Sequence, residues 1–160
     1  MDILVNLGNR MILNIELVPS TVWESSLYRL LSKNIWNKIR NEHIQKHGRK
    51  CQICGVTNGV MNLHEIWNYD DEKYIQKLEG FILLCRLCHH VKHIGLAGIL
   101  ASEGKLDYDE VVEHFCKVNK CTKKGFEKHV DTAFEIWEKR SKYQWKQDFG
   151  KYAEFLSNEN

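Results

Sequence analysis

The spacing of hydrophobic and polar positions changes along the chain, and the first change falls at Pro19. Residues 1–18 alternate between apolar and polar side chains, which predicts one or two short β-strands. The next stretch, STVWESSLYRLL, has its large apolar side chains at helical spacing, and Thr21 and Glu24 have the spacing of a capping box. A helix is therefore expected to begin here.

A second helix is expected between Asn34, in the N-cap position, and Gly48, where a glycine can end it. It lies within a basic segment: residues 29–50 hold seven Lys and Arg residues and one acid, Glu42, so the formal charge is 7 − 1 = +6. Such a segment is compatible with a nucleic-acid partner or with a solvated helix face.

The centre of the chain, residues 49–98, is rich in cysteine and histidine. The stretch CQICG is expected to form a tight turn, VMNLHEIW predicts a strand, and HHVKHIGLAGIL predicts a helix. The stretch YIQKLEGFILLC mixes polar and apolar positions without a clear period. It is expected to begin as a mobile or helical segment and to end as a short apolar run.

The pattern becomes helical after Gly104. LDYDEVVEHFCKVNK predicts an amphipathic helix with Asp107 near its start, and residues 122–156 predict one long helix or two. The last four residues, SNEN, are expected to fray. The expected core face of the long helix consists of Phe126, Val130, Phe134, Trp137 and Trp145.

These elements predict an α+β protein in three parts: an N-terminal strand and helix extension (1–48), a cysteine- and histidine-rich core (49–98) and a C-terminal helical extension packed on it (99–160). The chain is 43% hydrophobic and 28% charged, as in globular proteins. No apolar run approaches the roughly 18 residues that span a bilayer, and the N-terminus lacks the basic start of a signal peptide. A cytoplasmic protein without a membrane partner is expected, and its oligomeric state is left open.

Two CxxC pairs provide the first candidate chemistry: Cys51 with Cys54, and Cys85 with Cys88. Clustered cysteines in the reducing cytosol favour metal binding over disulfides, and four thiolates on two tight turns match a tetrahedral structural zinc site. A redox role for these pairs would require a βαβ setting, which the pattern does not show. The other two cysteines are interpreted as ordinary, partly buried thiols: Cys116 and Cys121.

Four histidines of residues 49–98 remain once the cysteines have satisfied a zinc ion. His89 and His93 are four residues apart on the expected helix, so both imidazoles can reach one divalent ion. His64, on the preceding strand, could complete the set and leave coordination positions open, as catalytic metals require. His90 points about 100 degrees away from this face.

The motifs CQICG, LHEIW and LLCRLCHHVKH together resemble the HNH nuclease family, also called ββα-metal nucleases, in the form held by a four-cysteine zinc. The resemblance covers residues 49–95, and LCRLCHHVKH is similar to the family's closing LCxxCHxxKH pattern. It implies a β-hairpin followed by a helix that holds a second divalent metal, such as Mg²⁺, Mn²⁺ or Ni²⁺, against a phosphate. The implied function is an endonuclease that hydrolyses phosphodiester bonds, with DNA as the expected partner.

The resemblance also implies roles for single residues. The family's strand motif is usually His-His or Asp-His, in which the first residue binds the metal and the second is the general base. Here the dipeptide is His64-Glu65, so Glu65 stands at the position of the base, and His90 is a second candidate for that role. Gly80 occupies the place of the family's middle Asn. The closing metal ligands match His89 and His93.

The departures at Glu65 and Gly80 leave an alternative open. A chain without the base His and the Asn could be a non-catalytic, zinc-stabilised module that binds nucleic acid or a protein. Glu65 itself could instead pair with the basic helix or orient a histidine ligand. Three aromatic residues near the site could stack on bases, although the first follows an apolar strand and suits the core: Trp67, Tyr69 and Tyr74.

Overall fold

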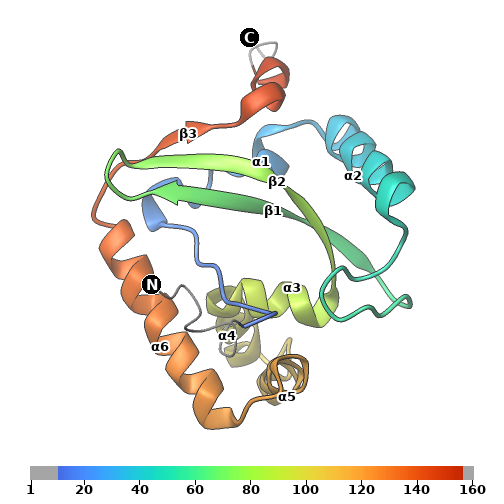
Figure 1. Ribbon diagram of the computed structural model, residues 1–160, viewed down its shortest axis with the longest axis vertical. Helices are drawn as coiled ribbons and strands as arrows, with labels where there is room; N and C mark the ends of the chain where they lie inside the picture. The colour runs from blue at the N-terminus through green and yellow to red at the C-terminus, as the bar shows by residue number, and fades with distance from the viewer. Residues whose placement is uncertain (1–10, 157–160) are drawn as a thin grey trace, which may run out of the picture.

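A long β-hairpin forms the centre of the computed structural model, which describes residues 11–156 (Figure 1). Strand β1 (Met61–Asp70) pairs antiparallel with β2 (Ile75–Cys85), and the short β3 (Lys146–Asp148) pairs in parallel with the start of β2. The sheet order is β1-β2-β3. The prediction of a mixed α+β protein is confirmed.

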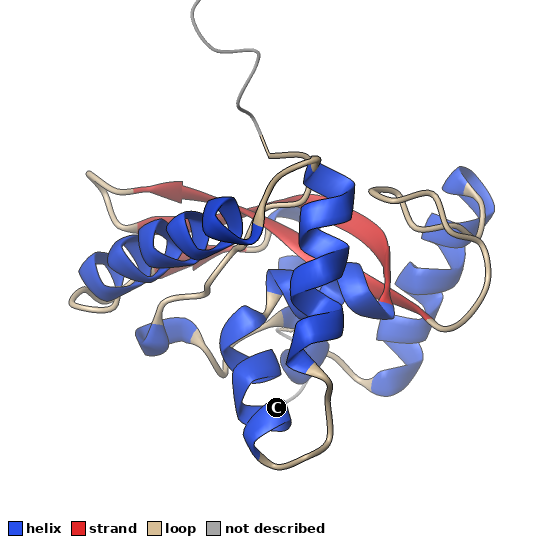
Figure 2. Cartoon of the chain, turned by 90° about the horizontal axis from the view of Figure 1, so that it is seen from below, coloured by secondary structure: helices blue, strands red, loops and turns tan. Residues whose placement is uncertain are grey.

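Most helices lie on one side of this hairpin; seen from below, they stand in front of the strands (Figure 2). Helix α3 follows β2 directly and packs against both long strands, α4 and α5. Within residues 11–156 no helix is both long and apolar enough to cross a bilayer. The helices are α1 (Leu27–Leu30), α2 (Lys33–His47), α3 (Arg86–Lys92), α4 (Ile94–Ser102), α5 (Tyr108–Asn119) and α6 (Lys123–Arg140), with 3-10 turns at Ser20–Val22 and Gly150–Phe155.

The hydrophobic core draws on all three predicted parts of the chain. Leu13 from the N-terminal part, Leu84 and Val91 from the centre, and Phe115 from α5 are all fully buried in one cluster. The Phe115 ring packs on Phe126 of α6 at a centroid distance of 5.1 Å. The central hairpin and the helices therefore share one hydrophobic core.

The predicted N-terminal strand is wrong for residues 11–18, which form neither helix nor strand, and residues 1–10 lie outside the described part. This extended segment crosses helices, and helices offer no free backbone ladder to pair with. Two of its N–H groups pair with side chains instead: the Leu13 N–H donates to Asn119 Oδ1 at 2.9 Å, and the Ile15 N–H donates to His129 Nε2 at 2.9 Å.

The first two helices begin later or earlier than predicted. The first is the single turn α1, capped by Ser26, while the Thr21 hydroxyl donates to the carbonyl of Tyr143 instead of capping a helix. Helix α2 is capped by Ser32, two residues before the predicted Asn34. Its predicted end is confirmed at Gly48, which has φ +82° and so favours glycine.

The prediction that residues 74–85 begin as a mobile or helical segment is wrong, because β2 runs unbroken from Ile75 to Cys85. One polar side chain near its start is buried and paired: the Gln76 amide donates to the Tyr69 hydroxyl at 3.0 Å. A bulge interrupts the alternation, since Ile66 pairs with Gly80 and Trp67 with Leu78. Glu79 is therefore left out of the register.

The helix predicted from residue 89 to residue 100 is split at His93, which has φ −105° and ψ 51°. The C-terminal helix α6 ends at Arg140, and the rest of the predicted helix is wrong, because residues 146–148 form β3. On the predicted core face Phe126 and Trp145 are buried, whereas Phe134 is 39% exposed. The SNEN tail lies outside the described residues.

Candidate metal centres

Four cysteine sulfurs gather where the chain enters and leaves the hairpin. Cys51 and Cys54 lie in the turn before β1, Cys85 ends β2, and Cys88 lies in the first turn of α3. All four sulfurs lie within 4.8 Å of one another, and Cys54 Sγ is 3.6 Å from Cys85 Sγ. Zn–S bonds of about 2.3 Å put tetrahedral sulfurs about 3.8 Å apart. These four side chains are close enough to hold one zinc ion.

Local hydrogen bonds hold these cysteines in place. Cys85 is the N-cap of α3, and its sulfur accepts from the Cys88 N–H at 3.5 Å. The first turn is fastened to β2 by Gln52, whose side-chain oxygen accepts from the Leu83 N–H at 2.7 Å. Hydrogen bonds from Cys85 and Cys88 lower the pKa of Cys51 well below its usual range, and the same contacts with Cys51 raise the pKa of Cys85 and of Cys88. A zinc ion would therefore have to displace thiol protons when it binds.

One hydrogen bond to this cluster was not predicted from the sequence. His114 of α5 places its Nε2 atom 3.1 Å from the sulfur of Cys88. A ring N–H donated to a thiolate orients the ligand and offsets part of its charge. The two residues are 26 positions apart, and no local motif connects them.

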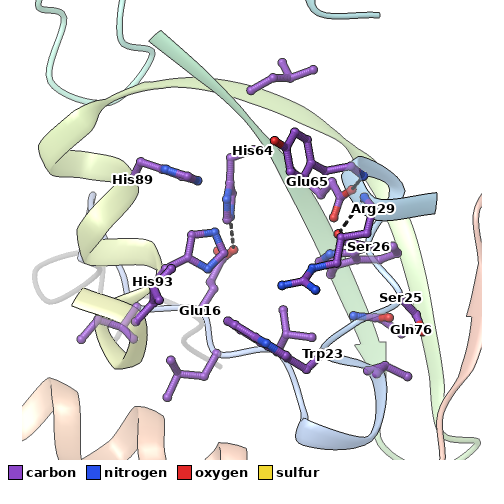
Figure 3. Close-up of a pocket in the computed structure, with 18 of the residues that line it drawn as sticks. Glu16, Trp23, Ser25, Ser26, Arg29, His64, Glu65, Gln76, His89 and His93 are labelled. Atoms are coloured by element: carbon purple, nitrogen blue, oxygen red, sulfur yellow. Dashed lines mark hydrogen bonds and ion pairs between the residues drawn. The ribbon is translucent and has the colours of Figure 1, made fainter. Parts of the chain in front are cut away.

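Three imidazoles form a second cluster on the helix-facing side of the hairpin, and Figure 3 shows them converging. One ring nitrogen each of His64, His89 and His93 lies within 4.8 Å of the others. Nitrogen ligands about 2.1 Å from one ion lie about 3 to 4 Å apart, so small rotations of the rings fit one divalent ion. The ring centroid distances are 5.7 Å for His64–His89, 4.9 Å for His64–His93 and 4.8 Å for His89–His93.

The protonation of these histidines suits metal binding. Burial, with the nearby His64 as a second cause, lowers the pKa of His89 to about 4. The same causes lower the pKa of His93 to about 3. Both imidazoles are therefore neutral at pH 7, and neutral imidazole is the form that binds metals.

His90 does not join this cluster. It is the neighbour of His89 on α3 and lies near Arg86 and Glu110 on the side of α5. Burial, with Arg86 as a second cause, lowers its pKa. Its predicted use as a second candidate base has no support in this geometry.

Glu65 combines two properties that point in different directions. Its side chain is buried, and burial raises the pKa of its carboxyl to about 7, a value that suits a general base. However, its carboxylate does not join the cluster of ligand atoms. It lies instead beside α1, where Oε1 accepts from the Tyr28 N–H at 3.1 Å (Figure 3).

Sequence reasoning missed an acid that contacts one imidazole of this cluster, although no oxygen of its carboxylate lies within 4.8 Å of all three ring nitrogens. Glu16, from the extended N-terminal segment, places Oε2 3.7 Å from His64 Nε2 and Oε1 3.0 Å from Lys92 Nζ. The Lys92 ammonium is buried and also donates to the side-chain oxygen of Asn14. Burial alone would raise the pKa of Glu16, but its contacts with His64 and Lys92 lower it to about 2.

A cavity of about 770 Å³ opens beside the three histidines. Trp23 lies on its wall with its ring 6.4 Å from that of His93, and Arg29 of α1 lies across the cavity from the histidines (Figure 3). Two further arginines on the wall have partners in the protein. Arg40 donates to the Met61 carbonyl, and Arg140 pairs with Asp71.

The aromatic residues predicted near the site are engaged with other rings. The Tyr74 ring stacks on Tyr143 at 4.3 Å, and the Tyr69 ring meets Trp145 at 5.3 Å. Trp67 is half-buried and contacts Phe149 at 5.8 Å. Of these three residues, Trp67 and Tyr69 line the cavity.

Comparisons with known proteins found no relative of this chain. No protein-family model matches the chain, and no curated protein or solved structure is significantly similar to it.

Proposed function

We propose that this chain is a divalent-metal-dependent endonuclease of the HNH type that hydrolyses phosphodiester bonds in DNA. The observation that carries the proposal is the convergence of His64, from the hairpin, with His89, from the helix that follows it, and His93, directly after that helix. Two features support it: the four-cysteine cluster at the base of the same hairpin, and the resemblance of the closing motif, LCRLCHHVKH, to that family.

The three imidazoles would hold the catalytic ion from one side and leave the side toward the cavity for substrate. Such an ion polarises a phosphate oxygen and lowers the pKa of a bound water. The backbone fixes the positions of the three ligand nitrogens. His89 and His93 are four residues apart in the chain, and the strand register places His64 opposite Ile82. With that ion bound, a water oxygen would bond to phosphorus while the bond from phosphorus to the leaving oxygen breaks, and the proton lost by the water would pass to the leaving oxygen or to solvent.

The cavity wall supplies groups for a phosphate and a base. Arg29 would bind the scissile phosphate across the cavity from the metal, because a guanidinium matches the geometry of phosphate oxygens. Trp23, with 40% of its surface exposed, would stack on a neighbouring base. Glu65 holds the backbone of α1, so it would act on the substrate through the placement of Arg29.

The test is a cleavage assay on supercoiled plasmid DNA with zinc-loaded protein and added Mg²⁺, Mn²⁺ or Ni²⁺. We expect nicking that EDTA abolishes and that falls at least 100-fold in His64→Ala and His89→Ala. His47→Ala is the matched control, because this exposed histidine of α2 lies outside both clusters. It should cleave like the wild type.

Cleavage that survives both histidine substitutions would come from a contaminant and would overturn the proposal. Zinc-loaded protein that binds DNA without cutting it under any metal would favour the alternative function, a zinc-stabilised nucleic-acid-binding module. The presence of Gly80 in place of the family's Asn is the observation that favours this alternative.

A further inference from the structure

We propose that Glu16 is a fourth protein ligand of the histidine-held metal and that Lys92 is its positioning residue; this rests on the metal site proposed above. The extended segment that carries Glu16 is tied to the end of α3, which bears His89 and directly precedes His93, since the Glu16 N–H donates to the Lys92 carbonyl at 3.4 Å. The chain thus delivers a carboxylate to a site built from a part of the sequence far from it.

The two carboxylate oxygens of Glu16 have separate partners. Oε1 accepts from the Lys92 ammonium at 3.0 Å, which leaves Oε2 directed at His64 Nε2, 3.7 Å away (Figure 3). Two tetrahedral ligands, each about 2.1 Å from an ion, lie about 3.4 Å apart. The separation between Oε2 and this ring nitrogen is therefore close to that of two ligands of one ion.

The buried ammonium of Lys92 holds the Glu16 carboxylate in place. Lys92 is 5% exposed, and a buried ammonium is costly unless a carboxylate accompanies it. The Glu16 carboxylate lies outside the group of ligand atoms within 4.8 Å of one another, so it has to rotate to reach an ion held by all three imidazoles. Its side chain is 37% exposed, which leaves room for Oε2 to turn toward that ion while Oε1 stays on Lys92. The pair explains why a lysine is buried directly before a histidine ligand.

A carboxylate ligand changes which ions the site accepts. Three imidazoles alone suit Ni²⁺ and Zn²⁺, whereas Mg²⁺ and Mn²⁺ prefer carboxylate and water oxygens. With Glu16 in place the site should bind Mn²⁺ better than three histidines could. Removing the carboxylate should therefore weaken Mn²⁺ more than Ni²⁺.

The experiment titrates zinc-loaded protein with Mn²⁺, followed by the loss of the free-ion EPR signal, and with Ni²⁺, followed by calorimetry. No DNA is present, so the readout is independent of cleavage. In Glu16→Gln we expect Mn²⁺ affinity to fall at least 10-fold and Ni²⁺ affinity to fall by a clearly smaller factor. Glu24→Gln, at an exposed acid of the same part of the chain, should bind both ions like the wild type.

A double variant separates ligation from charge balance. If Glu16 served only to neutralise the buried lysine, Glu16→Gln with Lys92→Met would regain wild-type Mn²⁺ affinity, and that result would overturn the proposal. Equal losses for Mn²⁺ and Ni²⁺ in a folded Glu16→Gln would overturn it as well. Zinc content and circular dichroism establish that each variant is folded. Wild-type protein that binds Mn²⁺ through Glu16 but cuts no DNA would refute the nuclease proposal alone.

Discussion

Substitution of Glu65 by Gln decides between the two roles that its environment suggests. Glu65→Gln keeps the shape of the side chain and one carbonyl oxygen for the Tyr28 N–H, but it removes the group that could take a proton. A raised pKa is expected of a base, whereas the hydrogen bond to α1 is expected of a structural anchor. The structure favours the anchor, because the carboxylate does not join the ligand atoms of the three histidines.

The two roles differ in magnitude. Loss of a general base costs about 10²–10⁴-fold in rate, or about 3–5 kcal/mol in the transition state. Loss of an anchor costs the difference between a charge-assisted and a neutral hydrogen bond, about 1 kcal/mol, and relief of the burial of a charge offsets part of it. We therefore expect Glu65→Gln to cleave DNA within about 10-fold of the wild type and to lose at most about 1 kcal/mol of stability.

The assay is single-turnover cleavage of plasmid DNA with Mn²⁺, together with urea unfolding of the same preparations. Glu65→Ala, which removes the acceptor altogether, should lose more stability than Glu65→Gln, by about 1–3 kcal/mol. A fall of 100-fold or more in Glu65→Gln, with Mn²⁺ affinity and unfolding unchanged, would refute the anchor and restore Glu65 as the base.

Three further predictions test the scaffold. His114→Phe removes the hydrogen bond to the Cys88 sulfur, so zinc loss to a chelator should be about 10–100-fold faster. A colorimetric zinc indicator measures this rate, and an unchanged rate would show that His114 has no role at the cluster. Phe115→Ala removes a fully buried ring that packs on Phe126 and should lower the free energy of unfolding, measured in urea, by about 3–5 kcal/mol. A loss below about 1 kcal/mol would contradict the core described above. Asp71→Asn breaks the exposed ion pair with Arg140 at the far end of the hairpin and should lower the free energy of unfolding by less than about 1 kcal/mol, measured by thermal unfolding, without changing cleavage. A larger loss of stability would show that this pair holds α6 against the hairpin.

The parts of the site that lie close together in sequence could be predicted from it. The four-residue spacing of His89 and His93 brings two imidazoles together, although the predicted helix is split at His93, and the CxxC turns hold their sulfurs by local backbone geometry. Asp107 was expected near the start of α5, and it caps that helix by accepting from the N–H of Asp109 at 3.0 Å. In each case the interaction that fixes the conformation lies within a few residues.

The parts that depend on distant partners could not be predicted. The start of β2 is polar, and it is a strand because β1, β3 and the partly buried Gln76–Gln147 hydrogen bond supply its pairing. Glu16 lies 76 residues before Lys92, and the pattern around it suggested only a strand. Its approach to His64 becomes visible only when the extended segment is placed across the helices.

Helix α3 is the element that joins the two candidate metal centres. It has only seven residues, and an isolated helix of that length is not stable in water. Cys85 caps its start, Cys88 lies in its first turn, and His89 and His93 follow within and just after it. A zinc ion on the four cysteines would tie this short helix to the end of β2, where the register also fixes His64. The position of the three imidazoles would therefore depend on the sulfur site, whereas the four sulfurs, held by their own turns, need no ion among the histidines.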